Sequence, residues 1–378
     1  MGISAIVNSS TFKKYFVPGI IFQSVVIAGG YGTGRELVEY FVNYGNLGGL
    51  MAMLLISMVI WSVVCAATFE FARMFKAYDY RTFFKKLLGK FWVLYEICYY
   101  VLLLIVLAVV ASAAGSILEE IFGLNYWIGV IGMMVGVGVL VFKGKETIEK
   151  VLSYWSFLLY GMYILFLIIA FSKFGAQIAS AVTNGNVEPG WAMGGFQYAF
   201  YNLGIIPAVL FATRHIETRK EAIGSGIMAG IIGMVPGLFL YLAIIGQYPG
   251  VLEATVPTNY ILTVIGSPFL QISFQVVLFV TLIETGTGFI YAVNERVASV
   301  FTEKGEVMSK GITGGMTIVL LVLGAFIAQF GLIGLIAQGY GTITWGFFVF
   351  YVVPVLTLGV YKIINADKEK IGELESVD

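Results

Sequence analysis

Glu284 is a carboxylate near the middle of an apolar stretch that runs from residue 266 to residue 300. On a helix, Thr281 and Thr285 share its face. A charged group in apolar surroundings is costly unless it is paired or hydrated, so its default interpretation is functional. We expect this face to line a path for an ion or a solute. The alternative is a structural pair with Arg35 or a nearby tyrosine.

The stretch VIAGGYGTGREL, residues 26 to 37, combines four glycines with two charges. Four glycines within six residues give up a whole turn of helix propensity. Unwound backbone at membrane depth is tolerated only where it is buried in protein or lines a wet cavity. We therefore expect non-helical backbone at Gly30 and Gly32, and a half-helix from near Thr33 whose positive end points at an anionic group. The residues expected to contact a solute here are Gly29, Gly30, Tyr31, Gly32 and Thr33.

Arg35 and Glu36 follow these glycines directly. Their position just beyond the break suits two roles equally: contact with a substrate carboxylate, or a gate pair on the outer side. Glu70 and Glu96 lie near the ends of their apolar stretches, within reach of Lys or Arg. For these two we expect a gate or structural salt bridge.

A second interruption occurs in FQYAFYNLGIIPAV, residues 196 to 209, where Gly204 and Pro207 follow Asn202. Its Phe-Gln start and its glycine repeat the spacing of FQSVVIAGG, residues 22 to 30. Paired breaks of this kind favour an internal repeat, with the two breaks facing each other across a central cavity. Further solute contacts are expected from Tyr100, Tyr201, Asn202 and Gly204.

The composition excludes several classes of protein. With 59% hydrophobic and 12% charged residues among 378, a water-soluble fold would lack the polar surface to cover itself. The formal net charge is zero and no basic block exists, so no nucleic-acid partner is expected. His215 is the only histidine, and no GxSxG, HExxH or P-loop pattern occurs. We therefore expect no catalytic residues, no metal centre and no bound cofactor.

Ten apolar stretches are long enough to cross a bilayer. Their approximate limits are 15–44, 47–75, 88–118, 126–143, 146–173, 190–214, 221–246, 266–300, 310–329 and 332–362. With a cytoplasmic N-terminus, 20 of the 22 lysines and arginines fall in cytoplasmic segments, and only Arg35 and Lys173 lie elsewhere. This distribution predicts a multi-pass protein of a bacterial or archaeal cytoplasmic membrane, with both termini in the cytoplasm.

Half of ten spans is an odd number, so a second five-span repeat would be inserted upside down. We expect residues 1–174 to form the first repeat and residues 175–362 the inverted second repeat. Residues 363–378 are polar and are expected to form a loose cytoplasmic tail.

Ten spans, with breaks in the first and the sixth, resemble the LeuT-type five-plus-five inverted repeat of the amino acid, polyamine and organocation superfamily. More narrowly, AGGYGTGRELVEYF is similar to the glycine-rich first span of the YkvI-type membrane proteins. The resemblance implies an all-α fold and ion-driven transport by alternating access, with the solute held between spans 1, 3, 6 and 8. It also implies a cation site formed by carbonyls of the first break, such as that of Ala28, and by Thr281, Glu284 and Thr285. A carboxylate in this set departs from the usual pattern, so the coupling ion is either Na⁺ or H⁺.

The leading hypothesis is a symporter for a small zwitterionic or anionic organic solute that resembles an amino acid. Two alternatives remain: a membrane ligand sensor of the same fold, and a divalent-metal transporter. The second is disfavoured because neither break combines a carboxylate, Met and Asn. The expected partners are the solute and the lipid bilayer. The sequence leaves the identity of the solute, the stoichiometry and the oligomeric state open.

Overall fold

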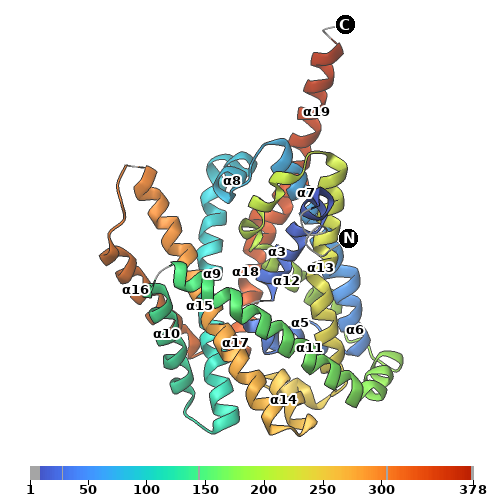
Figure 1. Cartoon of the computed structure of the whole chain (residues 1–378). Coiled ribbons are helices and arrows are strands. Elements are labelled where there is room, and N and C mark those ends of the chain that lie inside the picture. Colours follow the sequence, from blue (N-terminus) through green and yellow to red (C-terminus); the bar gives the residue numbers. More distant parts are fainter. Residues whose placement is uncertain (1–8, 28, 144, 304, 376–378) are drawn as a thin grey trace.

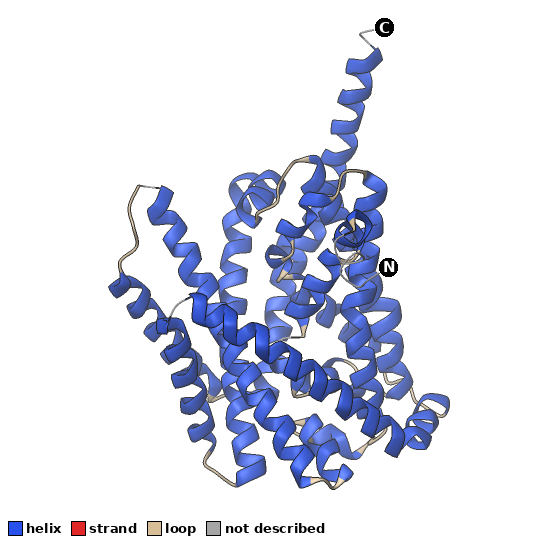
Figure 2. Cartoon of the chain, in the orientation of Figure 1, coloured by secondary structure: helices blue, strands red, loops and turns tan. Residues whose placement is uncertain are grey.

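The computed structural model describes residues 9–27, 29–143, 145–303 and 305–375, and within these ranges the chain contains helices and no strand (Figures 1 and 2). Large hydrophobic side chains such as Val322, Phe326 and Phe269 lie exposed on the outside of the bundle, as is typical of surfaces in contact with lipid. The all-α, multi-pass membrane fold expected from the sequence is confirmed.

Among the described residues, eight helical segments are long and apolar enough to cross a bilayer. They correspond to eight of the ten expected spans. They are Asn46–Met74 (α6, Asn46–Met51; η2, Ala52–Ser57; α7, Met58–Met74), Tyr80–Phe122 (α8, Tyr80–Leu88; α9, Trp92–Phe122), Tyr126–Lys143 (α10), Leu158–Thr183 within α11 (Lys145–Thr183), Arg219–Ile245 (α13), Pro268–Thr302 within α15 (Pro268–Glu303), Lys310–Ala328 (α16) and Gly331–Ala366 (α17, Gly331–Gly334, to α19, Val360–Glu375).

The other two expected spans, the first and the sixth, are divided into short pieces. The first span contains α3 (Val17–Val26), α4 (Gly29–Gly32), α5 (Arg35–Tyr40) and the 3-10 helix η1 (Val42–Tyr44). The sixth contains α12 (Trp191–Leu203) and the 3-10 helices η4 (Ile206–Ala208) and η5 (Leu210–His215). Both breaks are therefore confirmed, at the glycines and the proline that the sequence indicated.

The backbone of the first break differs in detail from the prediction. Gly30 and Gly32 belong to the single helical turn α4, so the expectation of non-helical backbone at these two glycines is wrong. The second half-helix starts at Arg35 and not near Thr33, because Gly34 adopts a left-handed conformation, with φ of 79°, at its N-cap. The chain thus leaves the helical path between α4 and α5. Ala28 lies outside the described residues.

Glycines in α13 allow close packing on α7. A Cβ atom added to Gly226 would lie 2.2 Å from the backbone nitrogen of Ala66, and one added to Gly230 would lie 2.2 Å from the hydroxyl of Ser62. Within lipid the hydrophobic effect does not drive helices together, so close packing of this kind stabilises the helix pair instead. The small residues thus fix α13 against α7, beside the first broken span.

We call the two ends of the bundle the terminal face and the distal face. The terminal face carries α8 and the start of α13, and α19 projects from it; the distal face carries η6 (Gly250–Glu253) and α14 (Pro257–Ile265), at the bottom of Figure 1. Residues 363–375 continue α19, so the expectation of a loose tail is wrong for this part. The expected boundary between repeats, at residues 174 and 175, falls inside α11; the division into two repeats stays a prediction.

Candidate functional site

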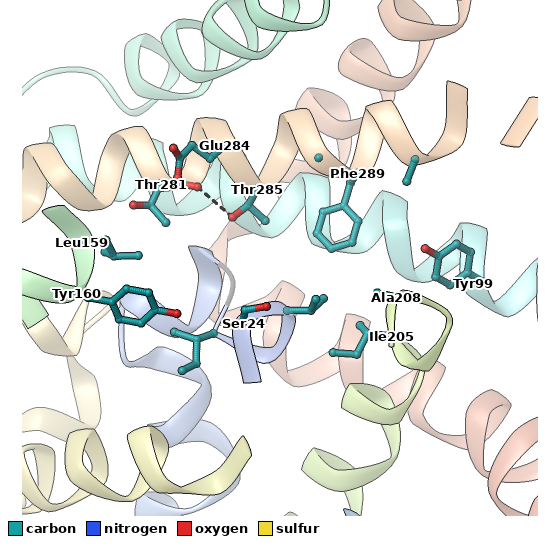
Figure 3. A pocket seen from close by; sticks show the side chains of 14 residues that line it. Ser24, Tyr99, Leu159, Tyr160, Ile205, Ala208, Thr281, Glu284, Thr285 and Phe289 are labelled. Carbon is teal, nitrogen blue, oxygen red and sulfur yellow. Dashed lines mark hydrogen bonds between the residues drawn. The ribbon is translucent and has the colours of Figure 1, made fainter. Parts of the chain in front are cut away.

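A cavity of about 410 Å³ lies where the two broken spans meet α9, α11 and α15. We call it the large cavity. Figure 3 shows Thr281, Thr285 and Phe289 on the α15 wall, with Ser24, Tyr160 and Ile205 across from them. Its lining residues come from the end of α3, the first part of α9 and of α11, both ends of η4 and the middle of α15. These are the parts of the helices on the terminal side of the two breaks.

Glu284 lines the large cavity together with Thr281 and Thr285. The glutamate is only 7% exposed, and its Oε1 atom has no hydrogen-bond partner among the described residues. Thr281 donates its hydroxyl proton to the carbonyl of Val277, and Thr285 donates to the carbonyl of Thr281, each at 2.9 Å. Because the protons are used within the helix, the two hydroxyl oxygens can serve only as acceptors toward the cavity. Carboxylate and acceptor oxygens on one helix face are suited to a cation or a proton.

The alternative of a structural pair between Glu284 and Arg35 is wrong. Arg35 lies on the distal side of the first break, where its Nη1 donates to the carbonyls of Leu252 and Ala254 at 2.8 and 3.1 Å. Its Nη2 forms an ion pair with Glu39 at 3.0 Å. Arg35 therefore binds the first span to the segment that precedes α14.

A second, much smaller cavity of about 30 Å³ lies next to the break. We call it the small cavity. Its polar lining residues are Glu36, Tyr201, Asn202 and Tyr340, and the hydroxyl of Tyr201 donates to Oε2 of Glu36. The rings of Tyr201 and Tyr340 are stacked, with centroids 4.5 Å apart and planes 9° from parallel. Spans 1, 6 and 10 each contribute at least one of these polar side chains.

The two cavities adjoin each other. Val25, Ile205 and Phe289 line both of them. Phe289 is partly exposed and comes from α15, one helical turn beyond Thr285. Three shared apolar side chains thus form the partition between the polar residues around Glu36 and the large cavity.

The distal side of the first break is closed by hydrogen bonds from three directions. The backbone nitrogen of Thr258 in α14 donates to the carbonyl of Thr33 at 3.0 Å. Tyr40 donates to the carbonyl of Ile336 at 2.7 Å, and Arg35 holds the segment before α14, as described above. Thr33, Thr258 and Tyr40 are all buried. The site is therefore sealed toward the distal face.

Salt bridges hold the helix ends at the terminal face, as expected for Glu70 and Glu96. Glu70 pairs with Arg73 at 2.7 Å and with Arg219 at 2.9 Å. Glu96 on α9 pairs with Arg296 on α15 at 2.6 Å. The last pair connects two of the helices that form the large cavity.

Several predicted solute contacts lie elsewhere than expected. Tyr100 lines a separate apolar cavity of about 60 Å³ with leucines of α9, whereas its neighbour Tyr99 lines the large cavity. A Cβ atom on Gly32 would lie 2.4 Å from Leu278, and one on Gly204 would lie 2.5 Å from the ring of Phe347. These two glycines therefore allow close packing against other helices, and the expectation that they face each other across the cavity is wrong.

The remaining predicted residues surround the small cavity or its distal closure. Tyr201 and Asn202 line the small cavity, as does Glu36. Tyr31 is buried, and its hydroxyl oxygen has no partner within the described ranges. The surroundings of Gly29 and Gly30, like Ala28, lie outside what the structure describes. Roles for all of these residues in binding stay predictions.

The lining residues that sequence analysis missed include Ser24, Tyr160, Phe289 and Tyr340. Phe289 could have been found by extending the face of Thr281 and Thr285 by one more turn. Tyr340 has no local signal, because it reaches the small cavity only through the packing of span 10 against α12. In the described part of the chain no group of three His, Cys, Asp or Glu side chains could hold a metal ion.

Comparisons with known proteins agree with this architecture. No model of a known protein family matches the chain. It is 22% identical over 274 residues to the uncharacterized membrane protein YkvI of Bacillus subtilis (strain 168), a match that covers 67% of this chain and 76% of YkvI. It is also similar to the crystal structure of MhsT in complex with L-phenylalanine, with a TM-score of 0.57, 14% identity, and coverage of 92% of this chain and 97% of MhsT. The LeuT-type fold predicted from the sequence is thus confirmed.

Proposed function

We propose that this protein is an ion-coupled secondary transporter that moves a small, amino acid-like organic solute across the membrane by alternating access. The observation that carries the proposal is a site at two helix breaks whose distal side is held by hydrogen bonds. Two adjoining cavities meet at two broken helices, and hydrogen bonds of Thr258, Arg35 and Tyr40 close the site toward the distal face. In alternating access, the central site of a transporter is closed toward one side of the membrane at a time.

The orientation of the charges supports the assignment of the open side. The lysines and arginines concentrate at the terminal face, which the positive-inside distribution predicts to be cytoplasmic. On this interpretation the large cavity belongs to an inward-facing state. The Glu96–Arg296 ion pair lies about one helical turn from Tyr99 and Ala292, which line that cavity.

Ion coupling is supported by the α15 face. A carboxylate that is 7% exposed and has an unpartnered oxygen costs several kcal/mol in a membrane unless it gains a cation, a proton or water. Two acceptor hydroxyls lie on the same face. Sodium and proton coupling are both compatible with this chemistry. The carboxylate and hydroxyl oxygens suit sodium, while the carboxylate alone suffices for a proton.

Uptake into proteoliposomes tests the proposal. The purified protein would be reconstituted and offered a panel of radiolabelled amino acids and related amines, with sodium and pH gradients imposed separately. We expect saturable accumulation of at least one solute above its outside concentration, driven by one of the two gradients. Saturable binding without accumulation under any gradient would instead identify a ligand sensor.

A further inference from the structure

The small cavity places a buried carboxylate next to aromatic rings without a cationic side chain. Glu36 is only 5% exposed. Within the described residues no Lys or Arg pairs with it, because Arg35 points to Leu252 and Ala254. The hydroxyl of Tyr201 donates to its Oε2 atom. A carboxylate can accept about four hydrogen bonds, so this contact leaves capacity for a further donor.

Two tyrosines line the small cavity beside this carboxylate. Tyr201 presents its hydroxyl to Glu36, while its ring stacks face to face on that of Tyr340. The hydroxyl of Tyr40, whose ring lies 5.6 Å from that of Tyr201, is used by the carbonyl of Ile336. A carboxylate forms its strongest hydrogen bonds with a cationic donor. The carboxylate of Glu36 therefore favours a cation as its further ligand.

We propose that Glu36, in the small cavity beside the hydroxyl of Tyr201, is the subsite for the ammonium group of the transported solute; this inference rests on the proposed transport function. A volume of about 30 Å³ accommodates a group of the size of a water molecule, which an ammonium group matches. The rest of the solute lies in the large cavity, which Phe289 separates from Glu36. Phe289 must move aside when the ammonium group enters.

The subsite determines the class of solute. The described residues that line the two cavities include the carboxylates of Glu36 and Glu284 but no lysine or arginine. A solute with a carboxylate and no amino group would meet negative charge without a compensating side chain. The solute is therefore an amine or an amino acid, and not an organic acid.

Binding of matched probes separates these classes. Three sets would be measured by calorimetry on the purified full-length chain in nanodiscs: alanine, ethylamine and propionate; leucine, isopentylamine and 4-methylvalerate; phenylalanine, phenethylamine and 3-phenylpropionate. In at least one set, we expect the amino acid or the amine to bind at least about tenfold more tightly than the acid without nitrogen.

Glu36→Gln removes the charge and keeps the shape of the side chain. We expect this variant to bind the preferred amine about 10- to 100-fold more weakly, as for the loss of a charged hydrogen-bond partner. The preference for amine over acid should fall with it, and this ratio does not depend on how much of the protein folds. Glu120→Gln is the matched control, because Glu120 pairs with Asn259 near the distal face and lines neither cavity. It should leave both affinities unchanged.

The outcomes distinguish the subsite from the transport function. Equal or tighter binding of the acids, no binding of any nitrogen-containing probe, or an unchanged amine-to-acid ratio in Glu36→Gln would overturn the subsite. Selective binding of amines without uptake into proteoliposomes would overturn the transport function and leave the ammonium subsite in place. Uptake of an acid that lacks nitrogen would overturn the ammonium subsite and leave the transport function in place.

Discussion

Glu36 and Glu284 are buried to nearly the same degree, with 5% and 7% of their surfaces exposed, yet their surroundings differ. Glu36 lies in a cavity of about 30 Å³ and accepts a hydrogen bond from Tyr201. Glu284 lines a cavity of about 410 Å³, and its Oε1 atom has no partner among the described residues. Burial makes a charge expensive in both places. The groups that face the carboxylate decide what can compensate it.

The helices that carry the two carboxylates differ as well. Glu36 lies on α5, a helix of six residues that follows a left-handed glycine, whereas Glu284 lies on α15, a continuous helix of 36 residues. Threonine hydroxyls flank Glu284, whereas Glu36 accepts a hydrogen bond from the hydroxyl of Tyr201. Small hard cations prefer several oxygen ligands, while an ammonium group forms charge-assisted hydrogen bonds with a carboxylate. This difference supports our two proposals, a coupling-ion site on α15 and a solute site at the first break.

The largest effect is expected from Glu284→Gln. If Glu284 carries a coupling proton, accumulation driven by a pH gradient is lost in this variant. A proton carrier replaced by Gln mimics the protonated state, so solute exchange across the membrane should persist. A sodium ligand replaced by Gln should raise the sodium requirement by about tenfold or more.

Uptake and counterflow exchange at several sodium concentrations and pH values would be measured for wild type and Glu284→Gln. Full accumulation by the variant under every gradient would show that Glu284 has no coupling role, and the separation between the two carboxylates would then fail.

A second prediction concerns the different access to the two cavities. In a background with Cys65 and Cys98 replaced by Ala, Ser24→Cys should react with an impermeant maleimide from the terminal face at least about tenfold faster than Asn202→Cys. Ser24 is exposed in the large cavity, whereas Asn202 in the small cavity requires a local opening. Adding Phe289→Ala should reduce this difference. Equal rates in the parent background would contradict the partition between the cavities.

A smaller effect is expected at the distal closure. Arg35→Gln removes the guanidinium that holds the carbonyls of Leu252 and Ala254. Labelling of Thr33→Cys from the distal face should rise about three- to tenfold, in line with the loss of charged hydrogen bonds. Lys173→Gln is the control, because Lys173 holds the other end of α14 through the carbonyl of Ile265. Equal increases in both variants would show that α14 loosens as a whole.

The smallest effects are expected from the hydroxyls beside Glu284. Thr281→Val and Thr285→Val should each weaken binding of the coupling cation by about two- to fivefold, because each removes one neutral oxygen acceptor. Thr287→Val is a matched control: its hydroxyl also donates one turn back, to Ile283 at 2.7 Å, but it does not line the large cavity. The measurement is the ion concentration at half-maximal uptake. If all three variants behave alike, the hydroxyls stabilise the helix and do not bind the ion.

Helix length and the positions of the breaks could be predicted from the sequence because their causes are local. An apolar run of sufficient length must form a helix in lipid, where unpaired backbone groups are not tolerated. Clustered glycines and Pro207 interrupt that helix through their own backbone preferences. Glu284 could be identified for the same reason. The free-energy cost of a carboxylate in an apolar stretch is evident from that stretch alone.

Errors arose where the rotation of one helix against another decides the outcome. Tyr99 and Tyr100 are adjacent in α9, but only the first lines the large cavity. Neighbouring side chains point about 100° apart around a helix, so a small change in rotation exchanges one for the other. Gly32 and Gly204 were correctly located near the breaks, but they pack against Leu278 and Phe347.

The sequence by itself determined the membrane class, the spans and the two breaks, because hydrophobicity and backbone preference act within one segment. Only the tertiary structure decided that Glu36 accepts a hydrogen bond from Tyr201, that Arg35 turns to the carbonyls before α14, and that Phe289 lies between the two cavities. Each of these contacts joins residues more than 150 positions apart or depends on how several helices pack. Their geometry follows from the close fit of small residues between helices, which no single segment of the sequence specifies.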